Sequence, residues 1–200
     1  MSSLLAYGIV GSPKKNGNVD VLVSEVLNVA KDQSAQTNKI YLNDLQIKPC
    51  QSCEANPDPK YCLFDDDMNL VFDAFESGDI IALGSPVYFD TVSAQTKLMI
   101  DRSNCLMPLV KRRDGTSSFD KRLKKRKKGV FIAVVGVNQE FDTILTTIRG
   151  FFKWTDIELA ETILYSHDDN DLGAVMSDKK MMMRAFNVGG RIARQEKNSK

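Results

Sequence analysis

The residues from Gly11 to Asn18 combine side chains that could bind a phosphate. They read Gly-Ser-Pro-Lys-Lys-Asn-Gly-Asn and lie between the apolar run 4–10 and a helical pattern that begins at Val19. A strand that ends in small, turn-forming residues ahead of a helix can present several backbone N–H groups at one point, and such a point suits a phosphate. Hydroxyl, amide and ammonium groups in this stretch add to the backbone donors. The candidate phosphate-binding residues are Ser12, Lys14, Asn16, Gly17 and Asn18.

Two familiar phosphate-binding motifs are absent from this stretch. Lys15 has neither the glycine spacing before it nor the Ser or Thr after it that a Walker A loop requires, and there is no Gly-x-Gly-x-x-Gly. A simple ATPase and a dinucleotide-binding Rossmann protein are therefore not favoured, whereas a terminal phosphate monoester remains suitable. An ordinary strand-to-helix turn is the alternative, because Gly and Asn are also the commonest turn residues.

The elements that must position these residues follow from the hydrophobic pattern. Continuous apolar runs predict buried parallel strands, and apolar residues at helical spacing predict the helices between them. The predicted strands are 4–10, 38–42, 79–84, 129–135 and 158–165, and the predicted helices are 19–30, 68–77, 93–101, 141–152 and 179–194. Strands that alternate with helices indicate a doubly wound α/β protein with a five-stranded parallel sheet and helices on both faces.

The carboxyl ends of three strands are expected to meet at the site. In open α/β sheets, ligands bind beyond these ends, near the topological switch point. The loops that contain Ser12, Pro86 and Gly136 follow the first, third and fourth predicted strands. We therefore expect these three loops to converge.

Length and composition set the wider frame. The 200 residues, 42% of them hydrophobic, fit a single domain over 1–200 with a charged loop at 112–128 and a flexible polar tail at 195–200. A formal net charge of +1 favours neither nucleic acid nor an acidic membrane surface. Residues 1–3 lack a basic signal region and no apolar run reaches bilayer length, so we expect a cytoplasmic protein without a membrane partner. Its four cysteines are then reduced thiols.

Two motifs together resemble a known family. The stretch from Gly11, the sequence Gly-Ser-Pro-Val-Tyr-Phe from Gly84 and the helix 93–102 are similar to the NADPH-dependent FMN reductase and iron–sulfur flavoprotein group of flavodoxin-like proteins. Both motifs occur in the expected order, and the resemblance covers most of the chain. The pattern differs at Asp90, where such proteins often have a small residue, and at 137–139, where a glycine-richer loop is common.

The resemblance implies a fold, a cofactor and a site. The fold is flavodoxin-like, with strand order 2-1-3-4-5, and the cofactor is FMN with NADPH or NADH as electron donor. The first motif then holds the FMN phosphate, and the later loops border its ring, which needs an apolar, aromatic-lined slot. The resemblance also implies a homodimer with the flavin near the subunit interface. The residues that border the ring are Pro86, Val87, Tyr88 and Phe89, with Gly136 from the third loop.

The cysteines give an incomplete pattern. Iron–sulfur members of the resembled group carry a compact four-cysteine run, but residues 54–56 offer no third cysteine after Cys50 and Cys53. Cys62 follows later, and Cys105 could join only through a contact that the sequence does not reveal. Unligated thiols beside the active site rank first, a Cys50/Cys53 redox pair second and a metal third.

Three other features are assigned no chemistry. The basic run 121–128 could bind the extra phosphate of NADPH or a nucleic acid, but such runs are more often solvated faces. No aromatic residues are interleaved with it for base stacking, which disfavours nucleic acid. His167, the only histidine, precedes two aspartates and is expected on the surface or at a strand end. Met181 to Met183 fit helix packing.

The sequence therefore favours an FMN-dependent oxidoreductase. It would accept hydride from NADPH or NADH and pass electrons to a small quinone, flavin, nitro- or azo-type acceptor, with the flavin performing the chemistry and no catalytic side chain assigned. The alternative is a non-enzymatic flavin-binding electron carrier or redox-sensing interaction protein, possibly with a metal or iron–sulfur site at the cysteines.

Overall fold

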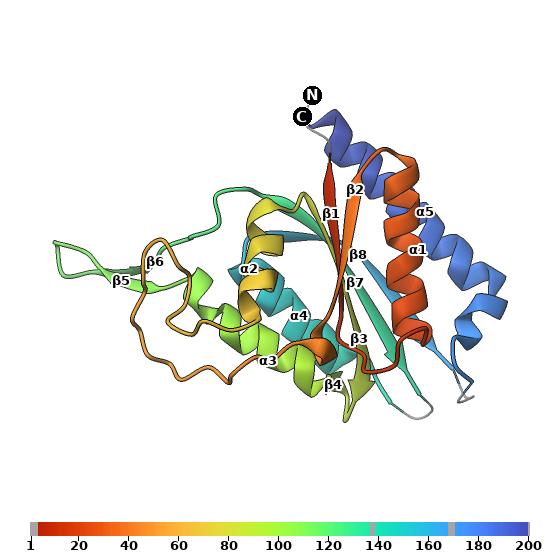
Figure 1. Ribbon diagram of the computed structural model, residues 1–200, viewed down its shortest axis with the longest axis horizontal. Helices are drawn as coiled ribbons and strands as arrows, with labels where there is room; N and C mark the ends of the chain where they lie inside the picture. Colours follow the sequence, from red (N-terminus) through yellow and green to blue (C-terminus); the bar gives the residue numbers. More distant parts are fainter. Residues whose placement is uncertain (1–3, 137–138, 168–170, 200) are drawn as a thin grey trace.

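The computed structural model describes residues 4–136, 139–167 and 171–199. Its core is a twisted sheet of parallel strands in the order β2-β1-β3-β7-β8, which confirms the expected order 2-1-3-4-5 (Figure 1). The strands of this sheet are β1 (Leu5–Val10), β2 (Gln36–Tyr41), β3 (Ile80–Tyr88), β7 (Lys127–Val135) and β8 (Ile157–Ser166). The helices are α1 (Asn18–Asp32), α2 (Met68–Ser77), α3 (Ala94–Arg102), α4 (Asp142–Trp154) and α5 (Lys179–Asn198).

Helices cover both faces of the sheet, because the continuous apolar strands have no polar face to leave in water. α1 and α5 pack on one face, over Ala6, Ala82 and Ile132. α2, α3 and α4 pack on the other, over Leu83 and Phe131. The predicted doubly wound arrangement is therefore confirmed, with one hydrophobic core on each side of the sheet.

The third strand is longer than the sequence predicted. β3 continues past Gly84 to Tyr88, whereas the sequence places the end of the strand at Gly84. Its pairing with β1 ends at Gly84, but its pairing with β7 continues to Pro86. A proline is tolerated there because the strand has lost its neighbour on one side. The expected loop is instead the end of a strand that turns back through the short strand β4 (Thr91–Val92).

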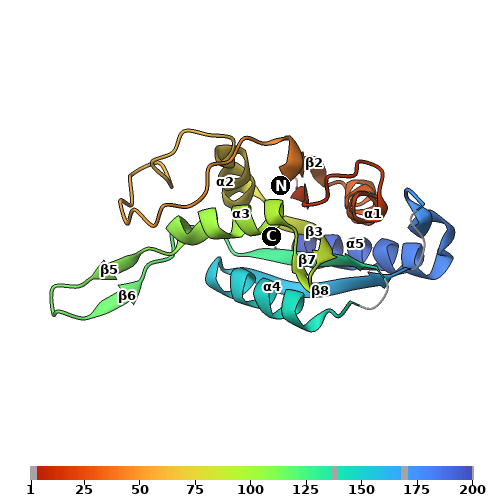
Figure 2. The ribbon, with the colours of Figure 1, turned by 90° about the horizontal axis from the view of Figure 1, so that it is seen from below.

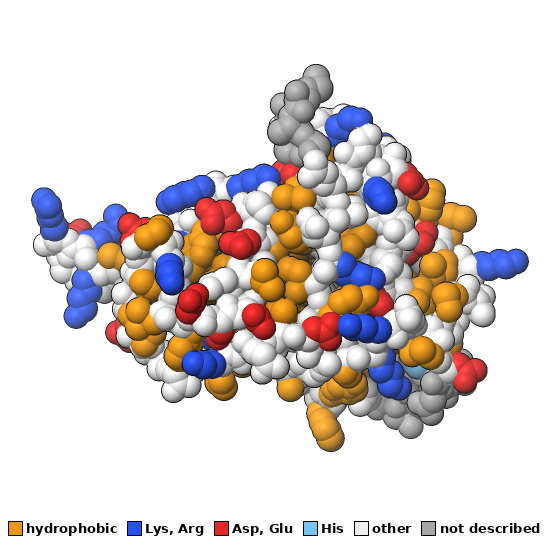
Figure 3. All heavy atoms as spheres, in the orientation of Figure 1, with side chains coloured by type: hydrophobic (Ala, Val, Ile, Leu, Met, Phe, Trp, Pro, Cys, Tyr) orange, Lys and Arg blue, Asp and Glu red, His pale blue; other side chains and the backbone are white. Residues whose placement is uncertain are grey.

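The charged segment 112–128 is not simply a loop. It contains β6 (Ser117–Phe119), which pairs with β5 (Leu109–Lys111) in an antiparallel hairpin, and its last two residues begin β7. Figure 2 shows this hairpin extending from the body on the same side as the long irregular segment 45–67. The space-filling view shows cationic side chains at the outer end of the hairpin and mixed charges elsewhere on this face (Figure 3).

The C-terminal helix also exceeds the prediction. α5 runs to Asn198, so residues 195–198 belong to a helix rather than to a flexible tail. Short 3-10 helices connect several elements, namely η1 (Leu42–Asp44), η2 (Ser103–Leu106) and η3 (Ala174–Ser177). In the described part of the chain, no helix is both long and apolar enough to cross a membrane.

Candidate functional site

A cavity of about 400 Å³ lies at the carboxyl ends of β1, β3 and β7, where the three predicted loops converge. These strand ends lie along one edge of the sheet, beside the start of α1 (Figure 1). The register explains the convergence, because Val10 of β1 pairs with Gly84 of β3, and Pro86 of β3 pairs with Val134 of β7. The residues of the first two motifs that line the cavity are Ser12, Lys14, Gly17, Asn18, Pro86, Val87 and Tyr88, and Gly136 joins them from the third loop.

Two of the predicted site residues do not line the cavity. Asn16 instead has a left-handed backbone (φ 61°), and its N–H donates to Oδ2 of Asp20 at 2.7 Å. It therefore shapes the turn. Phe89 is 94% exposed and lies in the two-residue turn between β3 and β4.

The turn of the first motif closes on itself. The N–H of Lys14 donates to Oγ of Ser12 at 3.2 Å, and the N–H of Gly17 donates to the carbonyl of Lys14 at 3.2 Å. The Ser12 hydroxyl still has its own hydrogen to donate. The first N–H groups of α1 have no carbonyl partner within the helix and carry its positive dipole end. The turn thus brings one hydroxyl, one ammonium and several backbone donors to the cavity.

Asp20 supports this turn from beneath. Its carboxylate is 2% exposed and binds Lys39 Nζ at 2.7 Å and the Tyr41 hydroxyl at 3.0 Å, as well as the N–H of Asn16. Burial alone would raise the pKa of Asp20, but these donors outweigh burial and lower the pKa below its ordinary value. Sequence reasoning missed Asp20, whose only sequence signal is an acidic residue in the first turn of the helix.

The segment after β8 also contributes to the cavity. Oδ1 of Asn18 accepts the buried N–H of Val175 at 3.0 Å, so this amide oxygen holds η3 in place. His167 also lines the cavity and stacks on Tyr165, with ring centroids 5.5 Å apart. It stands just after β8, as expected, although residues 168–170 that follow it lie outside the described residues. The lining residues that sequence reasoning missed are Val19, Val134, Val135, Gln139, His167, Asp171, Leu172 and Gly173.

The hairpin after β3 forms the outer edge of the cavity. Phe89 and Asp90 both have positive φ values (50° and 59°), which matches the tight two-residue turn that joins twisted antiparallel strands. Asp90 Oδ1 accepts the N–H of Glu140 at 3.0 Å, which ties this turn to the loop after β7. Asp90, which departs from the resembled pattern, thus joins two loops. The segment 137–139 also differs from the pattern of the resembled family. Residues 137 and 138 lie outside the described residues, whereas Gln139 lines the cavity.

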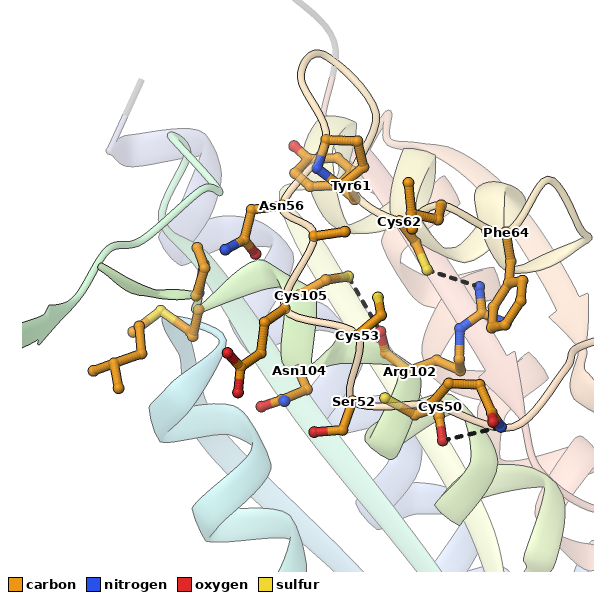
Figure 4. A pocket seen from close by; sticks show the side chains of 18 of the residues that line it. Cys50, Ser52, Cys53, Asn56, Tyr61, Cys62, Phe64, Arg102, Asn104 and Cys105 are labelled. Carbon is orange, nitrogen blue, oxygen red and sulfur yellow. Dashed lines mark hydrogen bonds between the residues drawn. The ribbon is translucent and has the colours of Figure 1, made fainter. Parts of the chain in front are cut away.

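A second cavity, of about 240 Å³, contains the cysteines. Cys50, Cys53, Cys62 and Cys105 all line it, and none forms a disulfide (Figure 4). Burial raises the pKa of the Cys105 thiol to about 12. The two cavities have no lining residue in common. The four thiols therefore line a cavity of their own and are not placed beside the first cavity.

The basic run is largely engaged within the chain. Lys121 pairs with Asp156, and Lys125 with the buried Asp79. Arg122 donates to backbone carbonyls of the cysteine segment, among them the carbonyl of Pro57 at 2.7 Å. These cations therefore pair within the fold, and Arg122 holds the segment 45–67 in place.

The fold and the position of the first cavity define a flavodoxin-like protein. The sequence matches the family model described as NADPH-dependent FMN reductase over residues 5–160. The chain therefore belongs to this family, as its motifs suggested.

Curated relatives are iron-sulfur flavoproteins of archaea. One from Methanocaldococcus jannaschii is 40% identical over 99 residues, which is 50% of this chain and 51% of the relative. One from Methanosarcina thermophila is 34% identical over 96 residues, 48% of this chain and 50% of the relative. The chain thus matches about half the length of these relatives. A second protein from M. jannaschii is 30% identical over 148 residues, 73% of this chain and 69% of the relative.

Solved structures agree on the fold. A flavone reductase has a TM-score of 0.70 and 22% identity, with 97% of this chain and 63% of the other chain covered. An archaeal flavodoxin has a TM-score of 0.57 and 12% identity, with 97% of this chain and 99% of the flavodoxin chain covered. At these identities the similarity shows the fold alone.

Proposed function

We propose that the protein is an FMN-dependent oxidoreductase that receives hydride from NADPH or NADH and passes electrons to a small quinone, flavin, nitro- or azo-type acceptor. Family membership supports FMN as the cofactor. The observation that carries the proposal is the cavity at the carboxyl ends of β1, β3 and β7, with the first turn of α1 at its border. Its volume lies within the range of known ligand pockets.

The inner end of the cavity fits a phosphate monoester. Ser12 and Lys14 contribute a hydroxyl and an ammonium group, and the first turn of α1 contributes N–H donors and its dipole. Asn16 and Asp20 act indirectly by fixing the turn. These residues would hold the FMN phosphate.

The outer end fits a flat ring. Pro86, Val87 and Tyr88 form one edge, and Val134 and Val135 add apolar surface. When bound, FMN supplies the hydride and electron chemistry. The role of the chain is to orient the ring and to leave Tyr88, which is 46% exposed, at the open side where donor and acceptor would approach in turn.

The proposal also covers the location, oligomeric state and partners of the protein. We place it in the cytoplasm as a homodimer, with a small-molecule acceptor and no nucleic acid or membrane partner. The nearly balanced charge, +1 overall, is compatible with that setting.

Anaerobic mixing tests the enzymatic proposal. Purified protein reconstituted with FMN is mixed with NADPH or with NADH, and the flavin absorbance is followed. Rapid loss of the oxidised flavin band, restored by a quinone, supports an oxidoreductase. A bound flavin that neither nicotinamide reduces would exclude it.

A flavin-binding electron carrier is the second candidate, and the cysteine cavity favours it. Four thiols in one cavity are unnecessary for a simple reductase, and the curated relatives are named iron-sulfur flavoproteins. A carrier would exchange electrons with a protein partner and show no turnover with small acceptors. Steady-state assays with a quinone therefore distinguish the two functions.

A further inference from the structure

A groove of about 1020 Å³ lies between α5 and β8, and it shares no lining residue with the two cavities described above. β8 is the last strand of the sheet, and among the described residues it pairs with β7 alone (Figure 2). The N–H and C=O groups on the outer edge of such a strand can pair with an added strand. The groove therefore combines an unpaired sheet edge with the side of a helix.

The second half of β8 lacks the features that usually keep an edge strand from pairing further. Edge strands are commonly short, contain proline or carry charged side chains. β8 has ten residues, and its part 162–166 contains neither a proline nor a charged residue. Nη2 of Arg184 donates to the carbonyl of Thr162 at 2.8 Å, so α5 reaches the strand backbone at one point. This edge is therefore suited to accept a further strand.

Cations outnumber carboxylates in the groove. The charged residues that line it are Lys180, Arg184, Arg191 and Arg194, against Glu161 and Asp178. Both carboxylates are already engaged, because Glu161 pairs with Arg191 and Asp178 caps the start of α5. In the described part of the chain, no carboxylate forms a salt bridge with any of the other three cations. The groove thus has an excess of positive charge that suits an anionic partner.

The two faces of a strand added to β8 would meet different surroundings, because successive side chains of a strand point to opposite faces. On the face that α5 covers, they would meet the cations of the groove. On the face that α4 covers, they would lie beside Leu159 and Leu164, which are half-buried and pack against the core on that side. A segment that alternates acidic and apolar residues complements both faces.

The length of the groove fits a short extended segment. On the helix side, its lining residues run from Asp178 to Arg194, which is about 24 Å at about 1.5 Å per residue. On the strand side, they run from Glu161 to Ser166. An extended chain rises by about 3.3 Å per residue, so about seven residues of an added strand would span the groove.

We propose that the groove between α5 and β8 is a docking site for an extended acidic segment of another protein, which adds to the edge of β8 as a further strand. A second copy of the chain fits less well, because in a two-fold pair each groove would meet itself and its cations would face like cations. Nucleic acid or anionic lipid would complement the charge but not the backbone edge. Ser166 in the groove directly precedes His167 in the first cavity, so a docked partner would lie beside that cavity, whatever its function.

Peptide binding tests the chemistry of the partner. The probe is a fluorescein-labelled peptide of eight residues in which Glu and Val alternate, and its control has Lys in place of Glu. By fluorescence anisotropy with the full chain, the acidic peptide should bind at least about tenfold more tightly, and its affinity should fall as salt is added. Equal affinity for the two peptides would overturn the proposal. Tighter binding to a labelled single-stranded DNA or to phosphatidylserine vesicles than to the acidic peptide would overturn it as well.

Charge reversal tests the location of the site. The double variant Lys180→Glu/Arg194→Glu changes two exposed cations of the groove, whereas Lys179→Glu/Lys197→Glu changes two exposed cations of α5 outside it. Both variants have the same net charge. With circular dichroism unchanged, the first should weaken the acidic peptide roughly tenfold or more, and the second should leave it within about twofold. Equal weakening by the two variants would show that net charge alone is responsible and would overturn the site.

Backbone methylation tests the added strand. In a paired strand, only alternate residues direct their N–H groups to the neighbouring strand, and their side chains share one face. Two further acidic peptides therefore carry N-methyl groups, one on every Glu and the other on every Val. One of them should lose roughly tenfold in affinity, and the other should keep the affinity of the parent peptide. Equal affinity of the two methylated peptides would overturn binding as an added strand.

Discussion

At Gly11 the turn 11–18 lies against Thr96 of α3, and replacement of this glycine gives a sharp test of the site's architecture. A Cβ at Gly11 would lie 1.9 Å from Oγ1 of Thr96 and 3.1 Å from the carbonyl oxygen of Gly84. Thr96 Oγ1 is within 2.9 Å of Ser93 Oγ, which donates to the Gly11 carbonyl at 2.7 Å. Gly11→Ala must therefore displace a buried hydrogen-bonded pair.

The expected loss of stability follows from these contacts. Overpacking a core costs about 1–3 kcal/mol, and an unsatisfied buried polar group costs about 1–3 kcal/mol. We expect Gly11→Ala to lower the free energy of unfolding by about 3 kcal/mol, which corresponds to a fall of about 6–12 °C in Tm for a chain of this size.

Gly136→Ala is the matched control, measured by thermal and urea unfolding of the flavin-free protein. Gly136 also borders the first cavity, but a Cβ there would meet no atom of the described residues within 4 Å. Its stability should therefore stay within about 0.5 kcal/mol of the wild type. If Gly11→Ala were as stable as Gly136→Ala, the close approach of the turn to α3 would be wrong.

Two further predictions concern buried charges. Asp20→Asn should lower the free energy of unfolding by about 2 kcal/mol at pH 7, because Lys39 and Tyr41 lose a carboxylate partner. The pKa of Asp20 in the folded protein lies below its ordinary value of 3.8. The wild type is therefore more stable than Asp20→Asn by the full amount above pH 3.8, and this difference in the free energy of unfolding disappears as the pH falls through the folded pKa. Urea titrations at pH 7 and in strong acid check this, and an undiminished difference in acid would contradict it. Lys127 is 1% exposed, and burial, followed by the charge of Lys125, lowers its pKa from 10.5 to about 8. The unfolded chain binds more protons between these values, so stability rises with pH across them. Lys127→Met should therefore raise the free energy of unfolding at pH 7 by up to about 3 kcal/mol and flatten its rise with pH. An unchanged slope of stability against pH would show that Lys127 does not cause the rise.

Much of the fold could be predicted because the relevant signals are local. The runs 4–10 and 129–135 are apolar without alternation, which is typical of buried parallel strands. Helix 68–77 was predicted with its observed bounds. The extension of β3 past Gly84 could not be predicted, because up to Pro86 it depends on pairing with β7, whose partner residues lie 48 positions further along the chain (Ile80 with Lys128). The last two residues of β3 pair with β4.

The candidate site was predicted in outline for a similar reason. The first and second motifs stand at strand ends, and parallel strands bring their carboxyl ends to one edge. Asp20 was missed because its role depends on contacts across the fold, to Lys39 and Tyr41. His167 was missed because only the convergence of the strand ends places it beside the other loops of the cavity. Cys105 is the clearest case, since only the packing of α3 beneath the segment 45–67 places it beside the other thiols.

Comparison of FMN with riboflavin tests the proposed phosphate site most directly. Calorimetric titration of the flavin-free protein should show FMN binding at least about a hundredfold more tightly, because charge-assisted hydrogen bonds contribute about 1.5–3 kcal/mol each. Lys14→Gln should weaken FMN about tenfold and leave riboflavin unchanged. Lys15→Gln, whose native lysine pairs with Asp44 at 2.7 Å instead, should change neither. Equal affinity for FMN and riboflavin in the wild type would contradict a phosphate site at Ser12 and Lys14.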